Sequence, residues 1–64
     1  MKVKKKYELE VGDKVKQGSS ELKIIGVHYD KEEDIKIYVV ELLDGEIKGA
    51  IDLIFPDYID EILV

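Results

Sequence analysis

Cysteine, arginine, asparagine, threonine and tryptophan are all missing from this chain of 64 residues. Without cysteine the chain has no disulfides, no thiolate nucleophile and no cysteine-ligated zinc or iron–sulfur cluster, so its stability must come from apolar packing. Without arginine it lacks the side chain that grips phosphate and guanine through two parallel hydrogen bonds. The composition therefore argues against nucleic acid as a partner.

Long apolar runs are missing as well. No stretch approaches the about 20 apolar residues that cross a bilayer, and residues 1–6 contain no apolar segment that could act as a signal peptide. We therefore expect a cytoplasmic protein without a membrane partner. A chain this short buries only about 60% of its unfolded surface, which leaves little room for an enclosed active site.

The charges that are present divide the chain into two parts. Ten lysines oppose fifteen acidic residues, which gives a net charge of −5. Residues 1–16 hold six of the lysines and three acids, whereas residues 17–64 hold four lysines and twelve acids. We expect a basic, flexible leader over 1–6 and a single domain over 7–64.

Alternation of apolar and polar residues predicts strands along the first half of the chain. Tyr7, Leu9 and Val11 alternate with glutamates, and a second short strand can pass through Val15 after a turn at residues 12–13. Residues 17–20 have the composition of a loop. From Leu22 onward the apolar face changes beside a glycine at position 26, which indicates a β-bulge or sharp bend.

The second half of the chain carries the clearest strand. Residues 30–34 are polar and suit a hairpin tip, and residues 35–43 read as the longest strand. The dipeptide Asp44-Gly45 predicts a tight hairpin turn, with a return strand over 47–51. Phe55 precedes a proline and should be extended. We expect a helical turn over 57–60 and a closing strand over 61–64, with a short amphipathic helix as the alternative ending.

Five short strands joined by tight turns predict an all-β fold, a small five-stranded antiparallel barrel with a short helical turn before the last strand. An open meander with a terminal helix is the alternative architecture.

Several short motifs resemble the layout of SH3-like barrels. These are Val11-Gly-Asp-Lys-Val15, the aliphatic hairpin with Asp44-Gly45 at its tip, and the final Glu61-Ile-Leu-Val64. Residues 11–26 are similar to the YodC-like family of bacterial and phage proteins of unassigned role, although Ser19-Ser20 stands where that family has Gly-Pro character. Its aromatic-Asp-Gly turn is here Leu43-Asp44-Gly45. The resemblance implies an SH3-like fold and a bacterial or phage origin, and such barrels host many unrelated binding roles.

The chemistry-bearing residues do not form a recognisable reactive group. His28 is the one histidine and the obvious general-base candidate, but no serine, cysteine or second histidine stands near it in sequence, and strand alternation turns it toward solvent. The acids of residues 30–34 lack the spacing of a calcium loop and suit a hydrated hairpin. We therefore expect no catalytic residue, no metal site, no cofactor and no enzymatic activity.

Binding residues are more plausible. Aromatic side chains at Tyr29, Tyr38, Phe55 and Tyr58 could line a groove. The strand over 35–43 is apolar on both faces, because Ile35, Ile37 and Val39 occupy the face opposite Tyr38, so either the strand curls or a partner covers it.

We predict a small protein-interaction or accessory module whose partner is another protein or a second copy. One alternative is an acidic inhibitor that mimics nucleic acid and binds a basic protein surface. A second alternative is weak nucleic-acid binding through the lysine leader and the aromatic face.

Overall fold

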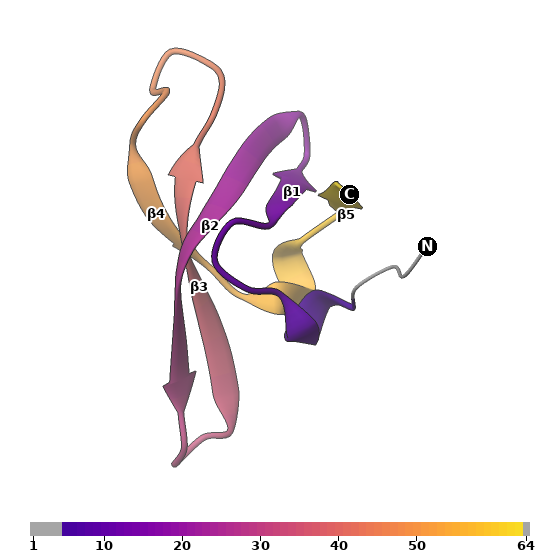
Figure 1. Ribbon diagram of the computed structural model, residues 1–64, viewed down its shortest axis with the longest axis vertical. Coiled ribbons are helices and arrows are strands. Elements are labelled where there is room, and N and C mark those ends of the chain that lie inside the picture. Colours follow the sequence, from indigo (N-terminus) through magenta and orange to yellow (C-terminus); the bar gives the residue numbers. More distant parts are fainter. Residues whose placement is uncertain (1–4, 64) are drawn as a thin grey trace.

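The computed structural model describes residues 5–63, which form a single antiparallel sheet of five strands (Figure 1). The elements in chain order are the 3₁₀ helix η1 (Lys6–Glu8), β1 (Lys14–Gln17), β2 (Ser20–Asp30), β3 (Ile35–Leu42), β4 (Ile51–Ile54), the 3₁₀ helix η2 (Pro56–Tyr58) and β5 (Glu61–Leu63). The strand order is β4-β3-β2-β1-β5. The predicted all-β class, the five antiparallel strands and the helical turn before the last strand are confirmed.

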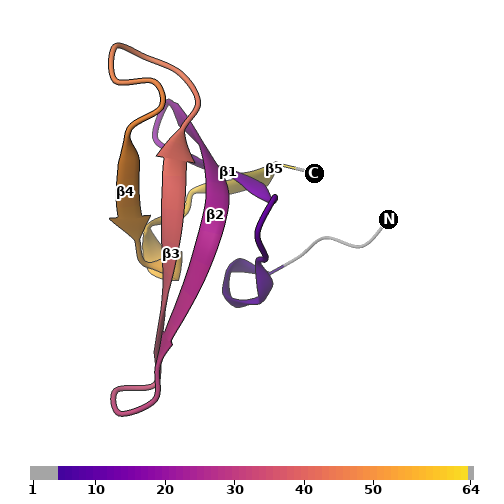
Figure 2. The same cartoon turned by 60° about the vertical axis from the view of Figure 1, so that its left-hand side comes forward.

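The sheet curls around its own core. Figure 2 shows β4, β3 and β2 side by side, with β1 and β5 turned out of their plane. Within residues 5–63 the edge strands β4 and β5 do not pair with each other, so a closed SH3-like barrel stays a prediction. Residues 1–4 of the predicted basic leader lie outside the described residues, and its last residue, Lys6, begins η1.

Eight apolar side chains fill the space inside the curl. Burying each large aliphatic side chain contributes about 1.5–3 kcal/mol, so this cluster is the main source of stability in a chain without cross-links. Among the described residues no polar or charged residue is classed as buried with them. The members of the core are Leu9, Val15, Leu22, Ile24, Tyr38, Val40, Ile54 and Ile59.

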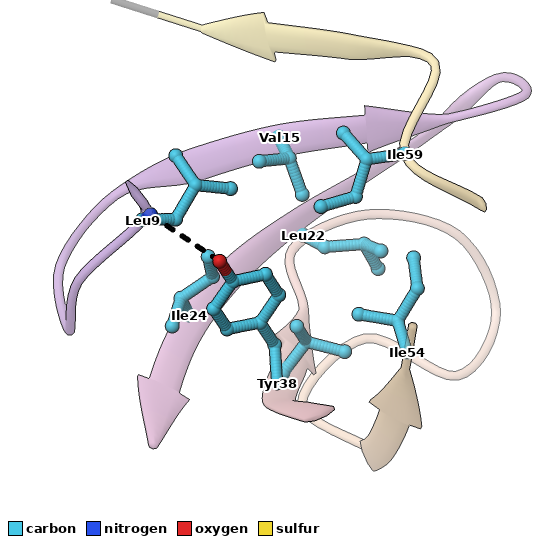
Figure 3. Packing of buried hydrophobic residues seen from close by; sticks show 8 residues of the cluster. Leu9, Val15, Leu22, Ile24, Tyr38, Ile54 and Ile59 are labelled. Carbon is cyan, nitrogen blue, oxygen red and sulfur yellow. Dashed lines mark hydrogen bonds between the residues drawn. The ribbon is translucent and has the colours of Figure 1, made fainter. Parts of the chain in front are cut away.

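Tyr38 is the largest core residue, and it also holds the N-terminal segment in place. Its ring is fully buried. Its hydroxyl donates a hydrogen bond to the carbonyl oxygen of Lys6 at 2.6 Å and accepts one from the backbone N–H of Leu9 at 3.3 Å (Figure 3). Burial raises the pKa of this phenol, and the hydrogen bond from Leu9 opposes that rise in part. The hydroxyl is therefore satisfied without water.

The raised pKa predicts a loss of stability in alkali. The folded protein holds the Tyr38 proton more tightly than the unfolded chain, whose tyrosines titrate near pH 10. Stability from this group is complete below about pH 10 and falls as the pH rises through the folded pKa. Urea unfolding at about pH 9 and about pH 11 should therefore show a steeper decline for the wild type than for Tyr38→Phe. Equal declines in the two proteins would contradict this assignment.

The predicted irregularity beside Gly26 is confirmed as a β-bulge. The pairing of β2 with β3 shifts register between Ile24, which pairs with Val40, and Gly26, which pairs with Val39. The extra residue moves the inward face from even to odd positions. Tyr29 therefore lies on the same inner side of the sheet as Ile24, and this places it in the candidate site.

The strand predicted through residues 7–11 is wrong. The Glu8 N–H donates to the Lys5 carbonyl at 3.0 Å and closes η1, and a turn follows at residues 11–12. Leu9 is buried, but Val11 is 65% exposed. Residues 7–11 cannot pair with β2 as a strand, because β1 already lies between β2 and β5. The short strand through Val15 is confirmed as β1, and residues 18–19 form a tight two-residue turn within the predicted loop.

The two-residue hairpin at Asp44-Gly45 is also wrong. The Leu42 N–H donates to the Ala50 carbonyl at 2.9 Å, and the Gly49 N–H donates to the Leu42 carbonyl at 2.7 Å. The hydrogen bonds that join the two sides of this hairpin thus end at Leu42, before residue 44, and β4 starts only at residue 51. Gly49 makes this closure possible because it adopts a positive φ of 90°. The 11-residue β2 is longer than the eight-residue β3, which was expected to be the longest strand.

The predicted chain ending, a helical turn followed by a closing strand, is confirmed over the described residues, and Val64 of the predicted strand lies outside them. Phe55 is extended at φ −80° and ψ 146° before Pro56, which starts η2. The Ile59 N–H donates to the Pro56 carbonyl at 3.1 Å, and the Asp60 N–H donates to the Lys16 carbonyl at 2.9 Å. The helical turn therefore delivers the chain directly to β1, where β5 pairs, and the alternative of a terminal amphipathic helix is wrong.

Candidate binding groove

The β2–β3 hairpin reaches beyond the strands that flank it, and this overhang creates a groove. β1 pairs with β2 only over residues 20–23, and β4 ends at Ile54, opposite Tyr38. Among residues 5–63, no strand lies beside the next inward pair along the hairpin, Tyr29 and Lys36, on either edge. Figure 1 shows η1 and η2 together beside this projecting part of the hairpin.

The groove has a volume of about 570 Å³ and opens to solvent. A groove of this size lies within the range of small-ligand and peptide sites. Its lining comes from both ends of the sequence and from the hairpin: Tyr7, Tyr29, Asp34, Ile35, Lys36, Phe55, Pro56, Asp57 and Tyr58.

Four exposed aromatic rings dominate this lining. Tyr7, Tyr29, Phe55 and Tyr58 are 45–62% exposed. The rings of Phe55 and Tyr58 are tilted at 52° with centroids 6.3 Å apart, which is a favourable geometry for neighbouring aromatic rings. Pro56 lies between Phe55 and Tyr58 in the sequence, and its side chain is buried. It therefore anchors η2 while the two rings stay accessible. The groove thus offers apolar surface on four accessible rings.

Two tyrosine–aspartate hydrogen bonds hold the sides of the groove. The Tyr7 hydroxyl donates to Asp57 and joins η1 to η2, and the Tyr29 hydroxyl donates to Asp34 across the β2–β3 hairpin. Each hydrogen bond to a carboxylate is the main cause of a raised pKa for its tyrosine. Both phenols therefore stay protonated at neutral pH and keep donating.

The rim of the groove is acidic. Asp34 and Asp57 belong to the lining, and the adjoining hairpin tip, residues 30–34, holds four acids against one lysine. The one lysine of the lining, Lys36, donates to the carbonyl oxygen of Tyr7 at 2.7 Å. A cationic group on a ligand would thus meet carboxylates at both sides of the groove.

The predicted binding residues separate into three places. Tyr29, Ile35, Phe55 and Tyr58 line the groove together. Tyr38 is in the core and is not accessible. Ile37 and Val39 are half-buried, and β3 alternation places them on the outer side of the sheet, away from the groove.

Sequence reasoning missed Tyr7, because it assigned that residue to a strand. It also placed Asp57 only in the expected helical turn over 57–60, although the Asp57 carboxylate accepts the Tyr7 hydrogen bond. The segment Phe55-Pro-Asp-Tyr58 carried a usable signal, since a proline that starts a single helical turn displays the aromatic residues on either side of it.

The structure places His28 outside the lining of the groove. His28 is exposed and pairs with Ile37 on the outer side of the sheet. No group of three histidine, cysteine, aspartate or glutamate side chains within residues 5–63 could hold a metal ion.

Comparison with protein-family models, with curated proteins and with solved structures found no match. Within residues 5–63 the chain has no helix with the length and apolar character needed to cross a membrane.

Proposed function

We propose that this protein is a non-enzymatic interaction module that binds an extended segment of another protein in the groove between η1, η2 and the β2–β3 hairpin. The observation that carries the proposal is the gathering of four half-exposed aromatic rings on a groove of about 570 Å³. Large accessible rings held in place cost little entropy when they are covered, so they are typical anchors for a partner chain.

The shape and charge of the groove favour a particular ligand. Aromatic-lined grooves suit the polyproline II conformation, because such a segment is already extended before binding and loses little conformational entropy. The carboxylates of Asp34 and Asp57 favour a lysine or arginine on that segment. We therefore expect a proline-containing peptide with a basic residue beside the prolines.

A titration followed by ¹H–¹⁵N NMR tests the proposal. The probe is a synthetic peptide of ten prolines flanked by two arginines, and the expected result is saturable shifts confined to the groove. Phe55→Ala and Tyr58→Ala should each weaken binding by about tenfold, the usual cost of truncating an aromatic anchor. Both residues are exposed, so circular dichroism should show that each variant is folded.

The matched control is Leu53→Ala, which removes an equally exposed apolar side chain from β4 outside the groove lining. It should bind the peptide as the wild type does. Absence of groove shifts at the highest soluble peptide concentration, or equal losses for Leu53→Ala and Tyr58→Ala, would sink the proposal.

The two alternative functions predict different responses. An acidic inhibitor would bind a basic protein surface through its carboxylates, so Tyr58→Ala would leave that binding intact. Nucleic-acid binding would place phosphates beside Asp34 and Asp57, which repel them. A single-stranded oligonucleotide titrated in the same way should therefore produce no groove shifts.

A further inference from the structure

β4 lies at an edge of the sheet, and a regular pattern decides which of its backbone groups are free to pair. The Leu42 N–H donates to the Ala50 carbonyl, and hydrogen-bonded pairs recur at every second residue of an antiparallel ladder. Asp52 and Ile54 therefore direct their backbone groups toward β3, whereas Ile51 and Leu53 direct theirs away from the sheet. An unpaired edge of this kind is a template for another strand.

The middle of this edge is covered by a side chain from the same strand. The Asp52 carboxylate accepts a hydrogen bond from the backbone N–H of Leu53 at 2.8 Å. It thereby occupies the donor that an added strand would need and places a charge beside it. The neighbouring apolar side chains need such protection, because Ile51 and Leu53 are 59% and 63% exposed.

We propose that the Asp52 carboxylate blocks strand addition at β4, and that a second copy of this chain pairs with this edge when the carboxylate is removed. The occupant follows from the register of the strand with itself. An antiparallel two-fold axis at Leu53 lets its N–H and carbonyl exchange hydrogen bonds with the same groups of the other copy. It also sets Leu53 against Leu53 and keeps the outer apolar side chains of both copies on one face.

Neighbouring registers fail for physical reasons. A two-fold axis at Asp52 would let Ile51 and Leu53 exchange hydrogen bonds with Leu53 and Ile51 of the other copy, but it would set two carboxylates against each other. A one-residue slip would place the outward Leu53 of one copy opposite an inward residue of the other. The backbone of the edge is therefore complementary to itself in the Leu53-centred and the Asp52-centred registers, and the Asp52 carboxylate opposes pairing in both.

Sedimentation velocity over a range of protein concentrations tests the proposal. Asp52→Val removes both the acceptor and the charge, and it should strengthen self-association by about tenfold, the effect expected when two hydrogen-bond donors are released. Asp52→Asn is the matched control, because it keeps an oxygen acceptor for the Leu53 N–H and should stay close to the wild type. Adding Leu53→Lys to Asp52→Val should restore the monomer, because the Leu53-centred register then sets two lysines against each other and the register centred on position 52 sets each lysine against the apolar Ile51.

Amide hydrogen exchange of the wild-type monomer gives a second test that needs no variant to fold. The Leu53 N–H is covered and should exchange more slowly than the Ile51 N–H, which also points away from the sheet. The proposal is overturned if Asp52→Val associates no more than the wild type, if Asp52→Asn associates as strongly as Asp52→Val, if Leu53→Lys leaves the association unchanged, or if the two amides exchange equally fast.

Discussion

Replacing Tyr38 by alanine is expected to remove a large part of the free energy of unfolding at 25 °C. The fully buried ring spans the core, and its removal costs about 3–5 kcal/mol in lost burial and cavity formation. It also deprives the buried Leu9 N–H of its acceptor. A domain of this size has a total stability of roughly 3–10 kcal/mol. This one substitution therefore removes much or all of the free energy of unfolding. Urea unfolding followed by circular dichroism would measure the loss.

Two further substitutions separate the parts of this effect. Tyr38→Phe keeps the ring and removes only the hydroxyl that bridges Lys6 and Leu9, so it should cost about 1–3 kcal/mol. Tyr58→Ala removes a ring that is 62% exposed and should change stability by less than about 0.5 kcal/mol. If Tyr38→Ala cost no more than Tyr58→Ala, Tyr38 would not be the central core residue.

The sequence predicts the middle of the fold well because the information there is local. Leu22 and Ile24 have even numbers, whereas Val27 and Tyr29 have odd numbers, so the two pairs would face opposite sides of a regular strand. Only an extra residue between the two pairs can place all four side chains on one face. The bulge and the inward position of Tyr29 therefore follow from the pattern of apolar residues alone.

The failed predictions come from contacts between distant residues. The alternation of Tyr7, Leu9 and Val11 is a valid strand pattern, but the Tyr7 hydroxyl is held by Asp57, fifty residues away in sequence. The Asp44-Gly45 pair is a valid hairpin signal, but the Asp44 carboxylate accepts the Glu21 N–H at 3.3 Å instead. In both places the chain forms a hydrogen bond to a residue distant in the sequence and does not adopt the structure that local propensity favours.

The candidate site is predictable only in part for the same reason. Phe55 and Tyr58 adjoin the same proline, so their association can be deduced from sequence. Tyr7 and Tyr29 come close to them through the curl of the sheet and the overhang of the β2–β3 hairpin. The spacing of apolar residues in the sequence indicates neither feature.

The acidic rim gives the second large expected effect. Asp34→Asn combined with Asp57→Asn removes both negative charges of the groove lining while keeping the oxygen acceptors of the Tyr29 and Tyr7 hydroxyls. Asparagine also tolerates the positive φ of 55° at position 34. Two partly exposed ion pairs at about 1 kcal/mol each correspond to about a thirtyfold loss of affinity for the arginine-flanked proline peptide. Isothermal titration calorimetry would measure it.

The control keeps the same net charge change but places it elsewhere. Glu32→Gln combined with Glu33→Gln removes two charges from the tip of the same hairpin, outside the groove lining. Only long-range attraction is lost, so binding should weaken by no more than about threefold at physiological ionic strength. The asparagine pair should also flatten the salt dependence of binding more than the glutamine pair. Equal losses from the two pairs would mean that the ligand senses the total charge of the domain rather than Asp34 and Asp57.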